Sequence, residues 1–168
     1  EALASVSLTT VDIAATSTTS RWIDSLVIRL ADREGVAVPN TNQGPRKQGK
    51  IAGGYVHEVD PGVEPWVVVL DFKSMYPSIM ISNNICSTTL VKDDNEDESH
   101  SVSPTTNTRY ISKEERLGLV PQLLDGLMQS RDIHKAALAK AKEEGDEEEA
   151  FLQDQLQYAV KILMNSFY

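Results

Sequence analysis

The sequence predicts an α+β fold in which antiparallel sheet elements follow a helical segment and precede an antiparallel hairpin of two helices. The first observation is the apolar run WVVVL at 66–70, and the second is the helical periodicity of residues 121–142 and 146–168. The third is Gly145, which lies between these helices in an acidic run, as is typical of a tight turn between antiparallel helices. We therefore divide the chain into residues 1–50, 51–117 and 118–168.

The first of these segments contains one predicted helix. Residues 1–20 are rich in Ser, Thr and Ala and show little pattern. From Ser20 the apolar residues follow one helical face, and Gly35 is a plausible stop. Residues 36–50 read as a linker that contains the bases Arg46, Lys47 and Lys50.

The second segment contains the predicted strands. Residues 51–59 read as a strand entered through two glycines, and 60–65 as a turn. The run 66–70 is apolar on both faces, which predicts a central strand covered on both sides. Pro77 permits a short helix, PSIMISNN, and the polar residues 91–110 predict a loop or a short hairpin.

Composition limits the possible partners only in part. The net charge of −9 argues at first against nucleic acid. However, eleven acids lie in two runs, residues 93–98 and 143–149, and the rest of the chain has 16 bases against 14 acids. No apolar stretch approaches the roughly 18 residues of a membrane span, so we expect no membrane partner.

The ends of the chain predict a fragment. Glu1 is preceded by neither Met nor a signal-like segment, and Tyr168 lies inside an apolar helical pattern without a stop signal. Cys86 is the only cysteine, which excludes an internal disulfide and favours a reducing compartment.

Asp71 stands at the tip of the predicted central strand, in the stretch DFKSMYPS. A carboxylate on a rigid strand end can hold a hard divalent cation, and a neighbouring backbone carbonyl can add a ligand. The turn after it can direct backbone N–H groups at an anion, next to the start of a short helix. From these residues alone, a plain turn after a core strand is an equal alternative.

Cations on the two long helices form a second candidate site. Arg131 and Lys135 share one helical face, and Lys161, Asn165 and Tyr168 share another. Arg131 and Lys161 lie 14 and 16 residues from the central glycine, which places them roughly 21 and 24 Å from the bend. Cations at a similar height on the two helices suit a polyphosphate. For any one of these residues taken alone, an ordinary solvated side chain is the favoured interpretation.

The glycine pair Gly53 and Gly54 follows the basic linker. Glycine lets another backbone approach closely, and nearby cations suit nucleic-acid phosphates. From these residues alone, a plain turn is the better interpretation of the pair.

Taken together, DFKSMYPSIM and KILMNSFY resemble two motifs of family B DNA polymerases. The first resembles the D-x-x-S-L-Y-P-S motif of the palm, with Met75 in place of Leu, and the second resembles the K-x-x-x-N-S-x-Y motif of the fingers. The glycine pair resembles the family's Y-x-G-G motif, with Ile51 in place of Tyr. The likeness is closest to archaeal members. It implies that residues 1–50 end an exonuclease domain, 51–117 form part of the palm and 118–168 form the fingers.

The resemblance implies roles for residues at the strand end. Asp71 would bind two Mg²⁺ ions, and the carbonyl of Phe72 would be a further ligand. The backbone N–H groups of Ser74 and Met75 would hold a deoxynucleoside triphosphate. Tyr76 would lie under the sugar and exclude a 2′-hydroxyl.

The resemblance also implies roles for the helical hairpin. The residues that would hold the triphosphate are Arg131, Lys135, Lys161 and Asn165. Lys161 would in addition donate a proton to the leaving pyrophosphate. DNA-binding residues would be Tyr168, near the nascent base pair, and the glycines Gly53 and Gly54.

The implied activity is template-directed addition of deoxynucleotides to a primer 3′-hydroxyl. The partners would be primer–template DNA and deoxynucleoside triphosphates, with a sliding clamp bound through regions outside this chain. The location would be the cytoplasm of an archaeal-like cell or the nucleus of a eukaryotic one. Because the chain stops before the family's D-T-D motif, the fragment alone is expected to be inactive. Two alternatives are an inactivated polymerase-like structural subunit and a helical-hairpin interaction module.

Overall fold

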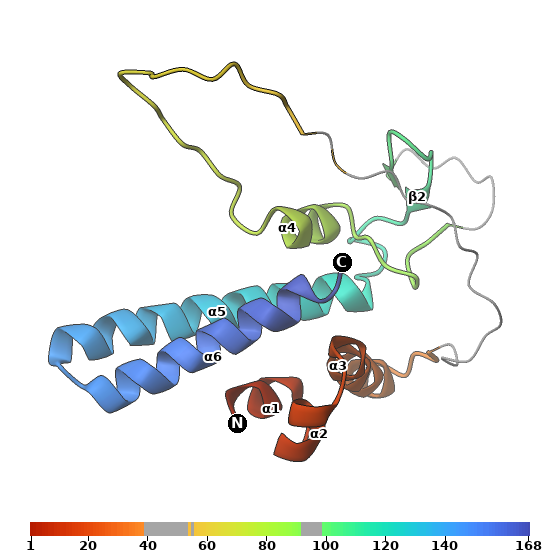
Figure 1. Cartoon of the computed structure of the whole chain (residues 1–168). Coiled ribbons are helices and arrows are strands. Elements are labelled where there is room, and N and C mark those ends of the chain that lie inside the picture. The colour runs from red at the N-terminus through yellow and green to blue at the C-terminus, as the bar shows by residue number, and fades with distance from the viewer. Residues whose placement is uncertain (39–53, 55, 92–98) are drawn as a thin grey trace.

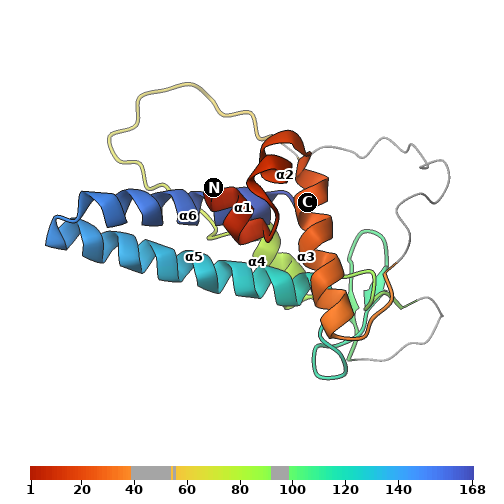
Figure 2. The same ribbon diagram turned by 90° about the horizontal axis from the view of Figure 1, so that it is seen from below.

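A long antiparallel helical hairpin forms the spine of the molecule (Figure 1). The computed structural model describes residues 1–38, 54, 56–91 and 99–168. Three N-terminal helices lie on one side of the hairpin, and a short helix with a small sheet lies on the other (Figures 1 and 2). The described chain is thus a mixed, mainly helical fold with one small antiparallel sheet of two strands.

The hairpin consists of α5 (Leu119–Glu144) and α6 (Glu147–Asn165). Gly145 adopts φ +73°, a left-handed conformation that glycine takes without steric cost and that ends α5. Asp146 then caps α6, because its Oδ1 accepts a hydrogen bond from the Glu149 N–H at 3.0 Å. Acids in the first turn of α6 also suit the helix dipole. The predicted hairpin and its acidic tip are therefore confirmed, except that α6 ends at Asn165 and not at the last residue.

The N-terminal segment is more helical than its sequence predicts. The helix α3 (Thr19–Arg33) agrees with the prediction, and Gly35 follows it with φ +65°. Two short helices precede it, α1 (Ala2–Ser7) and α2 (Val11–Thr16), where the sequence shows little pattern. Because α1 packs against α6, tertiary contact supports a helix that is too short to be stable alone.

The core lies where α5 and α6 meet α3. Its main cluster consists of Leu26 from α3 with the hairpin residues Leu124, Leu127, Val160, Leu163 and Met164. A second cluster joins the end of α3 to the start of α5 through Leu30, Ala31, Cys86 and Leu119. Both clusters fix the hairpin against the N-terminal helices.

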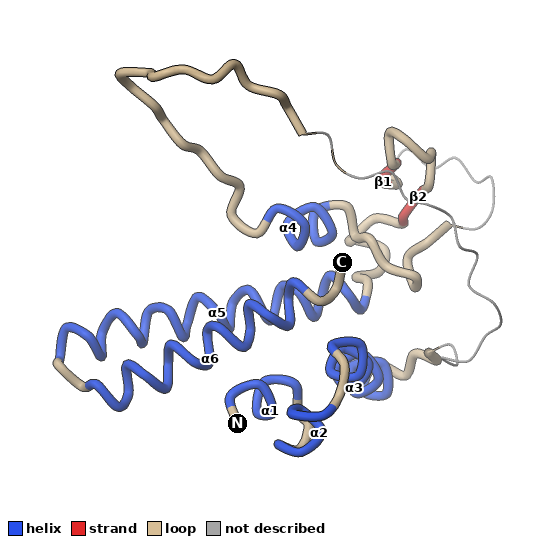
Figure 3. The backbone as a smooth tube through the Cα atoms, in the orientation of Figure 1, coloured by secondary structure: helices blue, strands red, loops and turns tan. Residues whose placement is uncertain are grey.

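The prediction of a central strand at 66–70 is wrong for this structure. These residues run in an extended segment that leaves the body of the molecule and contains no strand (Figure 3). Trp66 is 91% exposed and Leu70 is 89% exposed. A strand that is apolar on both faces needs neighbouring strands for its backbone hydrogen bonds and a cover on each face. The described residues place neither beside this segment.

The described residues around the predicted strand 51–59 also lack regular structure. Gly54 and residues 56–59 belong to no strand, and residues 51–53 and 55 lie outside the described part of the chain. Most of the basic linker and the acidic run 93–98 also lie outside the described part of the chain.

The small sheet confirms the short hairpin predicted within residues 91–110. Its strands are β1 (Ser101–Val102) and β2 (Arg109–Tyr110), with Ser101 opposite Tyr110. Before them comes α4 (Met75–Ser82), which packs against α5. No helix in the described ranges is long and apolar enough to cross a membrane.

Candidate functional site

The turn after Asp71 has an unusual backbone. Ser74 adopts φ 49° and ψ 53°, the left-handed region that non-glycine residues rarely enter, and it is the N-cap of α4. Alternation of left-handed and right-handed residues directs successive N–H groups to one side and makes a concavity that binds anions. The first N–H groups of α4 are also free of helical partners. A turn of this form can bind an anion, and the contacts from Ser74 and Met75 stay a prediction.

Asp71 and Phe72 are exposed on the approach to this turn. Asp71 has no hydrogen bond or ion pair with any described residue. Its carboxylate and the Phe72 carbonyl are hard oxygen donors, which suit Mg²⁺. No group of three or more His, Cys, Asp or Glu side chains within the described ranges is arranged to hold a metal ion, so Asp71 and Phe72 could supply only part of a ligand set.

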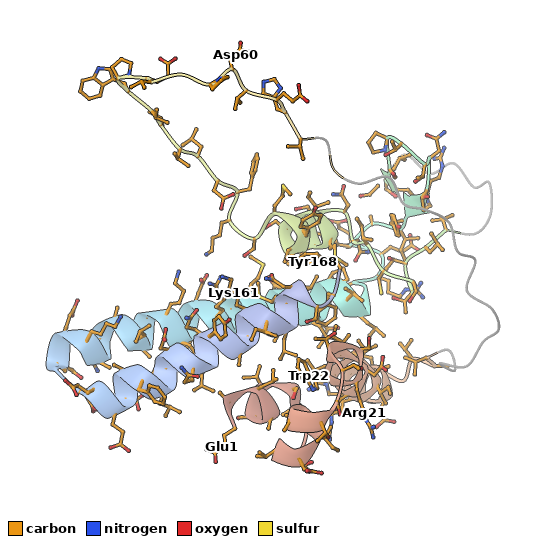
Figure 4. The ribbon with its side chains drawn as sticks, viewed as in Figure 1. Glu1, Arg21, Trp22, Asp60, Lys161 and Tyr168 are labelled. Atoms are coloured by element: carbon orange, nitrogen blue, oxygen red, sulfur yellow. The ribbon has the colours of Figure 1, made fainter. Side chains whose placement is uncertain are left out.

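The two sequence motifs meet through their tyrosines. The rings of Tyr76 and Tyr168 stack with centroids 4.5 Å apart and an interplanar angle of 21°. The Tyr168 hydroxyl donates to Asn165 Oδ1 at 2.8 Å. The structure therefore brings three predicted site residues together, one from α4 and two from the end of the chain. Figure 4 places Lys161 on the side of the hairpin that also holds Tyr168.

A contact that the sequence reasoning missed also joins the turn to the hairpin. Lys73 Nζ lies 2.8 Å from Asp132 Oδ2 on α5. The partners are 59 residues apart in the sequence, so no local spacing could have indicated the pair. The hydrogen bond from Lys73 lowers the pKa of the Asp132 carboxyl, and burial opposes this in part. The positive charges of Lys73, Lys135 and Arg131 lower the pKa further.

The register of the hairpin refines the predicted heights of the cations. His134 Nδ1 donates to Gln153 Oε1 at 2.7 Å, which links a residue 11 before the bend to one 8 after it. Counted from that pair, the Cα atoms of Arg131 and Lys161 differ in height by roughly 7–8 Å. Side chains lean toward the N terminus of their own helix, so Arg131 leans away from the bend and Lys161 toward it. The head groups are thereby drawn toward one level.

The environment of the predicted cations differs along the hairpin. Arg131 is half-buried, and its Nε is buried without a hydrogen-bond partner among the described residues. Lys135 and Lys161 are exposed. A buried donor without a partner costs free energy until an acceptor reaches it. The convergence of all three on one ligand remains a prediction.

A buried amide holds α4 in place relative to α5. The Nδ2 group of Asn84 donates to the carbonyls of Ile111 and Arg116, each at 2.9 Å, and its Oδ1 accepts from the Gly118 N–H at 2.9 Å. Asn84 follows α4 with φ 53°, and Gly118 immediately precedes α5. This junction fixes the turn and the hairpin to one another, and the sequence reasoning did not identify it.

The predicted glycine site is only partly described. Gly53 lies outside the described residues. Gly54 is exposed, with no atom near the position of an added Cβ. A DNA-binding role of this pair therefore stays a prediction.

Comparison with known sequences identifies one family along nearly the whole chain. The family described as DNA polymerase family B matches residues 9–168. A DNA polymerase from Thermococcus sp. (strain 9oN-7) is 34% identical over 155 residues, covering 90% of this chain and 19% of that protein. The DNA polymerase delta catalytic subunit of Glycine max is 34% identical over 151 residues, covering 86% of this chain and 14% of that protein.

A solved structure shows the same arrangement of the chain. The family B DNA polymerase from the hyperthermophilic archaeon Pyrobaculum calidifontis superposes with a TM-score of 0.74 at 29% identity. The match covers 99% of this chain and 21% of that one. The chain thus spans about a fifth or less of the length of these relatives.

Proposed function

The chain belongs to DNA polymerase family B, and from this premise we propose that it forms the nucleotide-binding part of a template-directed DNA polymerase. The observation that supports this most directly is the meeting of the two motifs. The strand-end turn and the end of α6 are far apart in sequence, yet Tyr76 stacks on Tyr168. A nucleotide that binds between the turn and the helical hairpin needs a site assembled from both motifs.

The triphosphate would bind between the turn and the hairpin. Backbone N–H groups of Ser74 and Met75 would donate to phosphate oxygens from the concave turn, and Arg131, Lys135, Lys161 and Asn165 would donate from the helices. The Nε of Arg131 has no hydrogen-bond partner among the described residues, and because it is buried, the side chain would have to shift to donate from that atom. These cations would also stabilise the charge that grows on pyrophosphate as it leaves.

The reaction would be attack of a primer 3′-hydroxyl on the α-phosphorus, with pyrophosphate as the leaving group. Bound Mg²⁺ would neutralise the attacking and leaving oxygens, and two ions are the usual number for this chemistry. Asp71 and the Phe72 carbonyl would hold the metal from this chain, with further ligands from outside the turn. Lys161 would protonate the pyrophosphate.

The partners follow from the same proposal. They are primer–template DNA, which would contact Tyr168 and the glycines Gly53 and Gly54, and deoxynucleoside triphosphates. Because no group of three or more metal-ligating side chains gathers within the described ranges, the isolated chain should not add nucleotides by itself. Nucleotide addition to a primed template by the 168-residue chain would contradict this.

The deciding experiment is the substitution Asp71→Asn in a full-length family B polymerase that includes this chain. Primer extension should fall by about 10³-fold or more, because a neutral amide oxygen binds Mg²⁺ much more weakly than a carboxylate and cannot bridge two ions in the same way. Asp60→Asn, on the same extended segment, is the matched control and should extend normally (Figure 4). Extension by Asp71→Asn at a rate near that of the wild type would exclude the metal assignment and favour a structural subunit.

A further inference from the structure

The ion pair between Lys73 and Asp132 lies where the proposed triphosphate site would be. Lys73 is the residue before Ser74, and Asp132 is the residue after Arg131. The pair is open to solvent, since the side chains are 68% and 55% exposed. Surface pairs of this kind contribute little to folding, so stability alone does not explain a contact between these two elements.

Asp132 is surrounded by positive charge. Arg131 precedes it directly, and Lys135 follows three residues later on a neighbouring position of the helix surface. Lys73 reaches it from the turn at 2.8 Å. All three cations also contribute to lowering the pKa of the Asp132 carboxyl, which shows that they act on the same group.

Cations gathered for a polyanion repel one another when that anion is absent. The turn adds to this positive potential, because Ser74 is left-handed and the first N–H groups of α4 have no partner within the helix. A carboxylate among these groups offsets the repulsion and gives Lys73 a fixed partner. An incoming anion must then compete with that carboxylate.

We propose that Asp132 is the resident counter-ion of the triphosphate site, and that Lys73 is a further triphosphate-binding residue which Asp132 holds while the site is empty. The inference rests on the proposed function. Binding of a triphosphate transfers Lys73 from the carboxylate to a phosphate oxygen. The ion pair and the ligand therefore exclude each other.

This arrangement also sets a minimum negative charge that an anion needs in order to displace the Asp132 carboxylate from Lys73. A single phosphate group has too little charge to replace the carboxylate and engage the cations on both elements at once. A triphosphate has several charged groups and can do both. The counter-ion thus favours triphosphates over monophosphates.

The test is the dissociation constant of sodium tripolyphosphate for the 168-residue chain, measured by titration calorimetry without divalent metal. Asp132→Asn should lower the constant by roughly three- to tenfold, because a competing charge is removed. Lys73→Met should raise it by about threefold or more, because one cation is lost. The matched control is Asp32→Asn, which makes the same change of net charge on the exposed end of α3, across the hairpin from α4 (Figure 1).

The outcomes separate this inference from the proposed function. Tighter binding by Asp132→Asn, together with an Asp32→Asn value like that of the wild type, supports the counter-ion. If the wild type binds tripolyphosphate and Asp132→Asn binds no more tightly than Asp32→Asn, the counter-ion role is wrong and the triphosphate site stands. If the wild type shows no saturable binding, the proposed site itself is wrong. Circular dichroism of each variant checks that the helices are retained.

Discussion

Individual residues join two parts of the chain that have no local relation in the sequence. Tyr76 stacks on Tyr168, and Lys73 pairs with Asp132. The sequence motifs identify Tyr76 and Tyr168 as candidate site residues, but they do not identify Lys73 or Asp132. Which side chain meets which is decided by packing of α4 against α5.

Tyr76 should control the choice of sugar in a full-length polymerase. Tyr76→Val should raise ribonucleotide incorporation by about tenfold or more while deoxynucleotide extension persists, because the shorter side chain leaves room for a 2′-hydroxyl. Tyr76→Phe keeps the ring and should keep the selectivity. The measurement is the ratio of kcat/KM for ribonucleotide and deoxynucleotide, and an unchanged ratio in Tyr76→Val would remove the proposed role.

The ion pair predicts a specific response to acid. The folded pKa of Asp132 lies below its ordinary value of 3.8. Its contribution to stability is therefore fully present above that value and is lost as pH falls through the folded pKa. The difference in unfolding free energy between the wild type and Lys73→Met should be constant from pH 7 down to about pH 5 and should vanish at the lowest pH. A difference that grew with acidification would contradict the assignment.

At the scale of elements, the hairpin and the junction with α4 define the site. The hairpin follows from local signals, namely helical periodicity, Gly145 and the Asp146 cap. The junction follows from a buried amide that reaches three backbone groups. Such a junction holds the turn at a fixed position beside α5.

Gly118 should tolerate no side chain at this junction. An added Cβ would lie 2.7 Å from Cys86 Cβ and 3.2 Å from Asn84 Oδ1. Gly118→Ala should therefore lower the unfolding free energy by about 1–3 kcal/mol. The control is Gly126→Ala, inside α5 with open space around the added Cβ, which should raise stability by about 0.5–1 kcal/mol. Denaturant unfolding measures both, and equal effects would show that the junction is loosely packed.

At the scale of the whole molecule, stability comes from the hairpin and the N-terminal helices rather than from the extended segment. Leu163 is fully buried, whereas Val68 is 83% exposed. The exposed apolar run from Trp66 to Leu70 has no cover among the described residues. The segment that presents Asp71 therefore contributes little to holding this chain folded.

Two substitutions test that distribution of stability. Leu163→Ala should cost about 2–5 kcal/mol in the isolated chain, because it leaves a cavity in the main cluster. Val68→Asp should change the free energy of unfolding by less than about 0.5 kcal/mol, because the side chain is already in water. Chemical denaturation of both variants gives the comparison. A large loss in Val68→Asp would show that residues 66–70 are covered in solution.

Much of this protein was determined by its sequence alone. Periodicity, caps and turn glycines act between neighbours, so the long hairpin, α3 and the short hairpin of strands could be predicted. Membership of the polymerase family was likewise visible in two short motifs and is confirmed by the match over residues 9–168.

The tertiary structure decided what depends on distant partners. The run 66–70 has a strand-like sequence, but a strand exists only where other strands bond to it, and the described residues supply none. The Asn84 junction and the pairing of Lys73 with Asp132 likewise depend on contacts between separate elements. The physical reason is that local signals fix backbone conformation within one element, whereas side chains from different elements meet only after those elements have packed.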